Sequence, residues 1–495
     1  MDKPADYGSA FRSSNLLRGT QIMKKNLKKI LPLVISLLIF GAGFIYLNLS
    51  RNKLAEPEVQ LSPRSFLYKE KFAEVSKYEG NDISTKGEVT NIRLNQTPGV
   101  SEPLIKCSPA DNNILAVCAN DFNVDNNNAR LFISYNKGRD WMERSIPLSP
   151  FLKASSYSDP WLEYDRSGNL YFTAVQYDLH DQKRDGLYFA KSSDNGISWN
   201  NELKFIAVNG TLQHKIDKPK VFISGSNVIH VIWTEVSGLN SFIKISSSRD
   251  NGITFSKPLI VSDSRAHFSA IAEDKNGILY LTYISDGNSI SAVKSFDGGG
   301  SWATIEKNLE IKTAGKLSGN RNILKSNSGE GIRINSEPSL CISKDNEVLI
   351  AYSARINDND LSDIFLTKLI NNNSEFAIPK RINNDNTRND QYLPVINCDE
   401  YGNVYVFYQD SRNDLNNEYS ESYISVSSDG CKTFKDHLIS TAPYKPSDVS
   451  VDRYFGDYNS FVISGKDLIA IWTDGRNGNY DLYAGILNTA NLFSR

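Results

Sequence analysis

An eight-residue motif recurs along the chain and constrains its fold more than any other feature. The clearest copy runs from Ser192 to Trp199 and fits the pattern Ser-x-Asp-x-Gly-x-Ser/Thr-aromatic. Complete or partial copies end at Trp141, Trp199, Phe255, Trp302, Phe376 and Phe434, about 50 to 60 residues apart except for a longer gap before Phe376. A fixed period of this length indicates a repeat protein, in which each repeat forms one four-stranded unit.

The composition of the motif has a physical reason. The Asp accepts hydrogen bonds from amides of its own turn, the Gly adopts a backbone angle that other residues avoid, and the aromatic ring packs between neighbouring sheets. Two copies depart from the pattern, with Asn136 in place of the Asp and Cys431 in place of the Gly. These residues resemble the Asp box of bacterial neuraminidase (BNR) repeats, and the resemblance covers nearly all of the chain after about residue 88. It implies a β-propeller of the sialidase superfamily.

Apolar runs between the motifs alternate with period two, which indicates half-buried strands joined by hairpin turns. The second strand of each repeat is the plainest, and it occurs seven times, at 114–119, 170–175, 229–234, 279–284, 348–353, 404–409 and 468–473. We therefore expect an all-β fold, a seven-bladed β-propeller spanning 88–495. A six-bladed ring, as the resemblance to sialidases implies, is the alternative. Residues 306–336 are expected to form an insertion.

The last repeat ends without room for a fourth strand. The segment 88–99 precedes the first repeat and resembles the fourth strands of other repeats, so we expect it to pair with the last three strands as the outer strand of that blade. This pairing would remove the exposed sheet edge that an open array leaves.

The N-terminal part of the chain has an apolar stretch at 30–49, preceded by Lys24, Lys25, Lys28 and Lys29. Its length is enough to cross a bilayer, and the lysines place residues 1–29 in the cytoplasm. We expect a transmembrane anchor, then a stalk at 50–87, with the propeller outside the cytoplasm, periplasmic or at the cell surface. A cleaved leader and a secreted protein are the alternative. Residues 1–22 precede a second start at Met23 and are possibly not translated.

The composition bears on possible partners and on cysteine pairing. The net charge of −2 over 495 residues gives no support for a nucleic-acid partner. Five cysteines cannot all pair. Cys107 and Cys118 lie on successive expected strands and either bridge or pack as small apolar residues, whereas Cys341 and Cys398, at similar places in their repeats, are expected to pack.

Alternation of the strands puts two sets of loops on one face, the loops between second and third strands and the connections from one repeat to the next. We name this the loop face. Acidic residues begin the innermost strands there in matching register: Glu102, Asp159, Glu337 and Asp457, with Asp217 one place off and His267 in the corresponding region of the fourth repeat. Two interpretations stay open, since such acids either bond between neighbouring blades or form a catalytic or cation site.

A sialidase needs arginines for the substrate carboxylate, a tyrosine activated by a glutamate, and an aspartic acid. The catalytic candidates on the loop face are Asp159, Tyr454, Asp457 and Tyr458, and the substrate-binding candidates are Arg265, Arg388, Arg412, Arg453 and Arg476. The F/Y-R-I-P signature of the family is missing, because neither Arg93 nor Arg333 is followed by the required Pro. Arg412 and Arg476 recur at equivalent places in their repeats, which favours a scaffold role.

Two classes of function follow from these residues. One is a sialidase-like glycoside hydrolase, and the other is a non-catalytic propeller that binds a glycan or a protein. The expected partners are a glycan or glycoprotein, and the membrane through the N-terminal helix. No cofactor and no metal site is expected, although the Asn- and Asp-rich runs at 120–128 and 357–363 carry Ca2+ ligand types without the Gly and closing Glu of an EF-hand.

Overall fold

The structure, a computed structural model, describes residues 83–121, 129–146, 155–178, 185–200, 204–209, 214–305, 307–318, 321–324, 331–446 and 455–493. The chain divides into two compact units, 1–60 and 61–495, and all described residues belong to the second. The expected membrane anchor at 30–49 lies outside the described residues. Within the described residues, no helix is long and apolar enough to cross a membrane.

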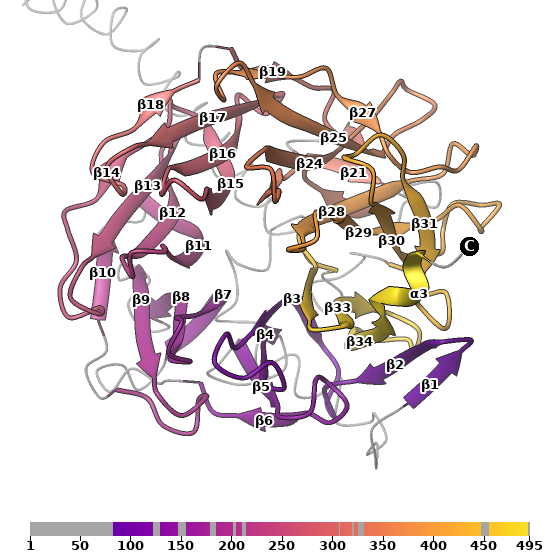
Figure 1. Cartoon of the computed structure of the whole chain (residues 1–495), viewed down its shortest axis with the longest axis horizontal. Helices are drawn as coiled ribbons and strands as arrows, with labels where there is room; N and C mark the ends of the chain where they lie inside the picture. Colours follow the sequence, from indigo (N-terminus) through magenta and orange to yellow (C-terminus); the bar gives the residue numbers. More distant parts are fainter. Residues whose placement is uncertain are drawn as a thin grey trace, which may run out of the picture. The chain divides into compact units, whose positions relative to one another are not determined.

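The described part of the chain is all-β, and antiparallel sheets follow one another around a ring, as in a β-propeller (Figure 1). The first three sheets are β3 (Val100–Cys107), β4 (Leu115–Asp121), β5 (Ala129–Ser134) and β6 (Met142–Arg144); β7 (Ser155–Tyr164), β8 (Leu170–Asp178), β9 (Asp185–Ser192) and β10 (Lys204–Asn209); and β11 (His214–Ile223), β12 (Ile229–Ser237), β13 (Asn240–Ser248) and β14 (Leu259–Ile260).

The next sheet contains β15 (Ala266–Glu273), β16 (Leu279–Ser285), β17 (Ser289–Ser295), β18 (Ala303–Thr304) and β19 (Leu309–Glu310). A small sheet follows within the expected insertion, made of β20 (Lys316–Ser318), β21 (Arg321–Leu324) and β22 (Ile332–Ile334). Two further sheets are β23 (Ser339–Ile342), β24 (Val348–Ala354), β25 (Asp363–Ile370), β26 (Glu375–Phe376) and β27 (Lys380–Arg381); and β28 (Gln391–Cys398), β29 (Val404–Asp410), β30 (Glu421–Ser427) and β31 (Lys435–Leu438).

The last sheet joins the two ends of the described chain. Its strands β32 (Ser460–Ser464), β33 (Asp467–Asp474) and β34 (Asp481–Asn488) come from the C-terminal repeat, and β34 pairs with β2 (Val89–Arg93). The expected pairing of 88–99 with the last repeat is therefore confirmed. This segment is not the outer strand, however, because β1 (Ile83–Lys86) pairs with the free side of β2. A short helix, α3 (Thr489–Phe493), follows β34.

The repeated motif forms the expected turn. In the copy at 192–199, Ser192 Oγ accepts a hydrogen bond from the Gly196 amide at 2.8 Å, and Asp194 Oδ1 accepts one from the Ser198 amide at 2.8 Å. The Trp199 indole donates to the Ser145 carbonyl of the preceding sheet at 3.1 Å. Where Cys431 replaces the Gly, the residue still takes a left-handed φ of 65°. The turn geometry thus survives the substitution that weakens its sequence pattern.

The core lies between neighbouring sheets, as expected for rings of this kind. Phe255 of one motif meets Phe189 of the preceding sheet edge to face, with ring centroids 5.0 Å apart. A Cβ added at Gly252 would come within 2.7 Å of the same Phe189 ring, and the glycine has a φ of +84°. The motif therefore needs Gly both for the backbone angle and for the close approach of the adjacent sheet.

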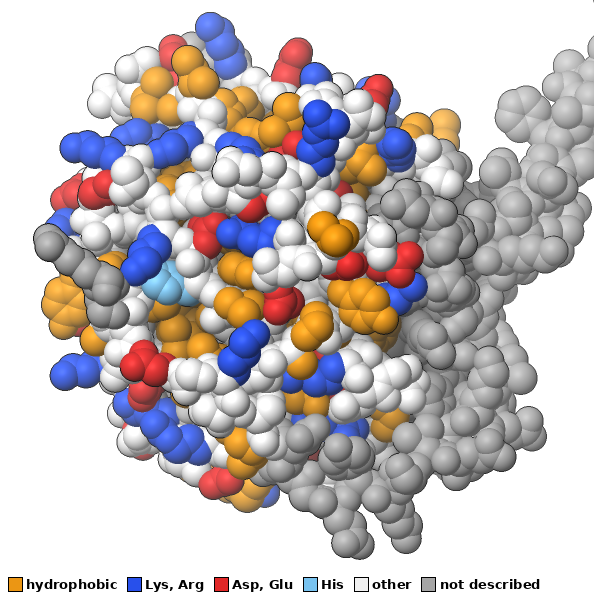
Figure 2. Space-filling model, turned by 90° about the vertical axis from the view of Figure 1, so that its right-hand side faces the viewer, with side chains coloured by type: hydrophobic (Ala, Val, Ile, Leu, Met, Phe, Trp, Pro, Cys, Tyr) orange, Lys and Arg blue, Asp and Glu red, His pale blue; other side chains and the backbone are white. Residues whose placement is uncertain are grey.

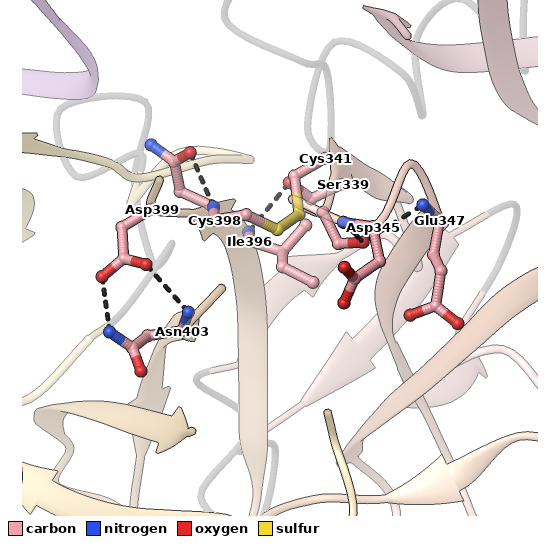
Figure 3. The surroundings of a disulfide bond; sticks show 10 residues. Ser339, Cys341, Asp345, Glu347, Ile396, Cys398, Asp399 and Asn403 are labelled. Carbon is pink, nitrogen blue, oxygen red and sulfur yellow. Dashed lines mark hydrogen bonds between the residues drawn. A yellow bond between two sulfur atoms is a disulfide. The ribbon is translucent and has the colours of Figure 1, made fainter. Parts of the chain in front are cut away.

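A disulfide joins Cys341 at β23 to Cys398 at β28, across neighbouring sheets (Figure 3). The expectation that these cysteines merely pack is wrong. Cys341 lies two residues before its hairpin turn and Cys398 lies one residue before, so their side chains point to opposite faces of their sheets and meet in the gap between them. Cys107, Cys118 and Cys431 are free thiols, so the alternative of a bridge between Cys107 and Cys118 is not realised.

Candidate functional site

Five innermost strands lie around the centre of the ring (Figure 1), and each has a bulge near its first residues. The residue at each bulge has a positive φ although none is glycine: Glu102 (57°), Asp159 (50°), Lys218 (49°), Phe268 (56°) and Leu393 (54°). In four of the five strands the next residue is a proline, and Phe268 is the exception. Proline has no amide hydrogen to donate, so it suits a position where the hydrogen-bond ladder of the sheet is interrupted. Strained backbone of this kind often marks a functional site.

The bulge decides which residue of the third repeat joins the acids. The sequence pattern aligned Asp217, one place off, with Glu102 and Asp159. In the structure the ladder register breaks between Asp217 and Lys220, and the left-handed residue is Lys218. The position that carries an acid in the first two repeats therefore carries a lysine in the third. The motif 216-IDKP-219 contained this information, since Lys218 directly precedes the proline as Glu102 and Asp159 do.

We name the central cluster by its five charged residues, Glu102, Asp159, Lys218, Arg333 and Asp457. Lys218 Nζ lies 3.1 Å from Glu102 Oε1, 3.2 Å from Asp159 Oδ1 and 2.8 Å from Asp457 Oδ2. The Arg333 guanidinium binds both oxygens of Asp457, through Nε at 3.0 Å and through Nη2. All five residues are more than nine-tenths buried, and when all three carboxyl groups are ionised the two cations leave one negative charge in excess.

The cluster also binds the backbone of neighbouring sheets. The Asp457 amide donates to Glu102 Oε1 at 2.9 Å, and the Lys218 amide donates to Asp159 Oδ2 at 3.4 Å. The Asn120 side chain bridges two bulges, because its Nδ2 donates to Glu102 and its Oδ1 accepts from the Asp159 amide at 3.0 Å. Part of the acid pattern thus serves to bond blades to each other, which is one of the two interpretations that the sequence left open.

The pKa values of two carboxyl groups in the cluster, Glu102 and Asp457, differ widely. Burial, strengthened by the negative charges of Asp457 and Asp159, raises the pKa of Glu102 to about 7, although Lys218 acts in the opposite direction. Burial would raise the pKa of Asp457 as well, but Arg333 and Lys218 outweigh it and lower that pKa to about 2. Environments that separate the pKa values of neighbouring acids are typical of acid and base pairs in active sites.

Two half-buried aromatic residues lie beside the central cluster. The rings of Trp161 and Tyr458 are 6.0 Å apart, and Lys218 Nζ lies 5.3 Å from the centre of the Tyr458 ring. Lys220 Nζ lies 4.6 Å from the centre of the Trp161 ring and 2.7 Å from Glu337 Oε1. The other carboxylate oxygen, Glu337 Oε2, is buried and accepts no hydrogen bond from the described residues. We name Trp161, Tyr458, Lys220 and Glu337 the aromatic edge.

The structure brings together only some of the candidate residues. Asp159, Asp457 and Tyr458 meet at the centre, whereas Arg453 and Tyr454 lie outside the described residues. Arg265 is exposed and pairs with Asp286 at 2.5 Å, and Arg388 is exposed. Among the described arginines, Arg333 is the one that reaches the central cluster. In the sequence, Arg333 stands out only as an incomplete match to the F/Y-R-I-P signature.

Arg412 and Arg476 occupy equivalent positions and make equivalent contacts. Arg412 binds Asp410 and, at 2.8 Å, Asp436, while its guanidinium lies 4.5 Å from the centre of the Tyr423 ring. Arg476 binds Asp474 at 2.7 Å and stacks 4.1 Å from the centre of the Tyr483 ring. These contacts fit the scaffold role, and the substrate-binding role proposed for both residues stays a prediction.

The surface visible in Figure 2 carries acidic and basic side chains interspersed with apolar ones. On this face neither sign of charge dominates, in keeping with the net charge of −2.

No family model and no curated protein sequence matches this chain. Solved structures that resemble it include an α-L-arabinofuranosidase from Fusarium graminearum, 10% identical, with 82% of this chain and 99% of that one covered and a TM-score of 0.47. An ulvan lyase is 12% identical over 84% and 96% of the two chains, with a TM-score of 0.49. A Trypanosoma rangeli sialidase is 13% identical over 81% and 73%, with a TM-score of 0.44. At these identities no function transfers from such likenesses.

Proposed function

We propose that this chain is a seven-bladed propeller that binds a carbohydrate at the aromatic edge of its central cluster. The observation that carries the proposal is the pair of half-buried aromatic residues, Trp161 and Tyr458, set beside buried charged groups where the innermost strands converge. Sugar rings stack on aromatic faces and bond to a few fixed polar groups, and sites of this kind combine both features. Glu337 Oε2 supplies an acceptor that no described donor uses.

The number of larger sheets supports a ring of seven blades. The described residues form seven sheets of four or five strands in addition to the three-stranded sheet of β20, β21 and β22. We infer that each larger sheet is one blade and that the small sheet is an insertion. A six-bladed ring would leave one of the larger sheets without a place.

Binding without hydrolysis fits the central cluster better than catalysis does. Glu102 and Asp159 are almost completely buried, and their oxygens accept bonds from Lys218, Asn120 and backbone amides. A general acid must reach the glycosidic oxygen directly. The described arginines also do not converge in a set of three on this site, as a sialidase would require for the substrate carboxylate.

A glycoside hydrolase is the second candidate, and one observation favours it. Burial raises the pKa of Tyr458 well above its usual value, and the negative charges of the nearby Glu102 and Asp159 add to this rise. A tyrosine, a glutamate and an aspartate are the residue types that sialidases use, and the pKa of Glu102 of about 7 would suit an acid at neutral pH. In this alternative Asp159, Asp457 and Tyr458 keep their candidate roles and Glu102 joins them.

The two candidates separate in one set of measurements on the full chain. A glycan array and a panel of fluorogenic sialosides should show retention of a glycan but no cleavage. Trp161→Ala should lose at least about tenfold in affinity, the scale of one ring contact, whereas Phe296→Ala, which removes an exposed ring elsewhere, should bind normally. Unchanged binding by a folded Trp161→Ala variant contradicts the site. Cleavage by the wild type that Tyr458→Phe and Glu102→Gln abolish would establish the hydrolase.

We also propose that the propeller is held outside the cytoplasm by an anchor at 30–49. The disulfide between Cys341 and Cys398 supports this location, because structural disulfides persist mainly in oxidising compartments. Protease added to intact cells or spheroplasts should digest the propeller. Protection in intact cells and spheroplasts, with digestion after lysis, would refute the orientation.

A further inference from the structure

Two carboxyl groups lie close together at the end of the loop that joins β24 to β25. Asp360 lies in this loop, and Asp363 begins β25, where it pairs with Ala354. The side chains of Asp360 and Asp363 are within hydrogen-bonding contact of each other. Asp360 is 8% exposed and Asp363 is 1% exposed, so water reaches neither carboxyl group freely.

One oxygen of each carboxyl group accepts no hydrogen bond from the described residues. Asp363 Oδ1 accepts from Arg381 Nε and, at 2.8 Å, from Asn383 Nδ2. Asp363 Oδ2 and Asp360 Oδ1, by contrast, are buried without a donor in the described structure.

The nearby donors are already engaged elsewhere. Arg381 Nη2 donates to Asp385 Oδ1 at 3.1 Å, and Asn383 Nδ2 also contacts Asp385 Oδ1 at 2.7 Å and Gln391 Oε1 at 2.8 Å.

Two buried carboxylates in contact repel each other strongly unless a positive charge or a shared proton lies between them. We propose that a divalent cation, Ca2+ in particular, binds between Asp360 and Asp363. Ca2+ accepts carboxylate, main-chain carbonyl and water oxygens in flexible geometry. Among the described residues, no three His, Cys, Asp or Glu side chains form a group that could hold a metal ion. The proposed site therefore has two carboxylates, and loop carbonyls and water complete its coordination.

The position of the pair gives the cation a structural role. Asp360 belongs to a loop between second and third strands, and Arg381, Asn383 and Asp385 belong to the connection that leads from β27 towards β28. Bound Ca2+ would fix the loop of Asp360 against the first residue of β25, which Arg381 and Asn383 already bond to that connection. With two side-chain ligands, we expect affinity in the weak range of about 0.1–1 mM that extracellular Ca2+ modules show.

The test uses the full chain, stripped with EDTA and then titrated with CaCl2 or MgCl2 up to about 5 mM, above that range. Ca2+ should raise the Tm of the wild type, since a ligand that binds only the folded state stabilises it, and Mg2+ should act less. Asp360→Asn and Asp363→Asn should each weaken Ca2+ binding at least about tenfold, a loss expected when one of two carboxylate ligands is removed. Asp358→Asn, in the same loop with a side chain 87% exposed, should respond as the wild type does.

Calorimetric titration with Ca2+ gives the second readout and does not depend on unfolding. A wild type that shows neither a Tm shift nor binding heat overturns the proposal, as does an Asp360→Asn variant that binds Ca2+ like the wild type. If Ca2+ has no effect while Asp360→Asn stabilises the EDTA-treated protein, the pair shares a proton instead, because an amide can donate to Asp363 Oδ2 as a protonated carboxyl would.

Discussion

At the scale of single residues, the centre of the ring combines backbone strain with buried charge. Glu102, Asp159 and Lys218 each hold a left-handed backbone and a charged side chain in an interior where neither is favourable alone. The charges of the three side chains compensate one another, since Lys218 lies within 3.2 Å of both acids. Removing one of these charges should therefore lower the free energy of unfolding by more than the ion pair contributes to it, because the opposite charges stay buried without that partner.

The pKa of Glu102 predicts a pH dependence of stability. Because this pKa is raised to about 7 in the folded state, the folded protein binds more protons than the unfolded chain between about pH 4.5 and 7, and the free energy of unfolding falls as pH rises through that window. Glu102→Gln removes this titration. The unfolding free energy of the variant should therefore fall less than that of the wild type over the window, and the two falls should differ by at most about 3 kcal/mol. Urea unfolding at a series of pH values measures both slopes.

The difference in slope between the wild type and Glu102→Gln measures the contribution of Glu102 to the pH dependence. Asp360, whose pKa is raised to about 7 by burial and by Asp363, contributes with the same sign to both slopes and cancels in their difference. The variant is expected to be less stable at every pH, because its amide nitrogen would face the Asn120 amide nitrogen. Parallel slopes would show that Glu102 does not titrate in this range.

At the scale of elements, each repeat is held to the next by a small set of recurring contacts. The motif turn supplies an aromatic ring to the preceding sheet, as Trp199 and Phe255 do. Between β23 and β28 a covalent bond adds to this packing. The sequence pattern predicts the turn residues, because they lie within eight positions of one another. The contacts between sheets join residues that are far apart along the chain.

The disulfide is expected to stabilise the fold by about 2–4 kcal/mol, since it closes a loop of 57 residues and restricts the unfolded chain. The double variant Cys341→Ser with Cys398→Ser should lose this amount in urea unfolding. Reductant should destabilise the wild type and leave the double variant unchanged. Cys431→Ser, which alters a free thiol, should keep the wild-type response to reductant. A wild type that is insensitive to reductant would contradict a stabilising bridge.

At the scale of the whole propeller, the ring is closed by strands from both ends of the described chain. Asn91 of β2 is fully buried, its Nδ2 donates to the Ile439 carbonyl at 2.9 Å, and its Oδ1 accepts from the Thr441 amide at 2.7 Å. Arg476 Nη2 also donates to Asn91 Oδ1, at 3.3 Å. This one side chain connects the closing strand both to the sheet that it completes and to the preceding one.

Asn91→Leu should therefore destabilise the propeller by about 2–4 kcal/mol, because it leaves the buried carbonyl of Ile439 and the half-buried amide of Thr441 without this partner. Limited proteolysis should cut the N-terminal strands of this variant faster than those of the wild type. Thr85→Ala, on the exposed strand β1, serves as the control and should change stability by less than about 0.5 kcal/mol. Equal stability of the two variants would mean that closure depends on the β2 ladder alone.

Local signals in the sequence were enough to predict the strands and the closing segment. Period-two runs gave the second strands, and the Ser, Asp and Gly of the motif gave its turn, because those residues act within eight positions of one another. The pairing of Asn91 and its neighbours with β34 was also predictable, since the last repeat lacked a strand and 88–99 resembled one. The strand β1 was missed because its four residues, Ile83–Lys86, carry no pattern of burial.

The sequence alone determined the all-β fold, the repeat and the acids that gather at the centre, because alternation and turn chemistry are local properties. Tertiary structure decided the rest. A bulge in β11 put Lys218 rather than Asp217 among the acids. Cys341 and Cys398 are offset by one position in their strands, so their side chains point to opposite faces of their sheets and meet in a disulfide. Arg333 reaches Asp457 across 124 positions of sequence. No pattern in a single strand encodes such contacts, because they depend on how separate sheets are placed around the ring.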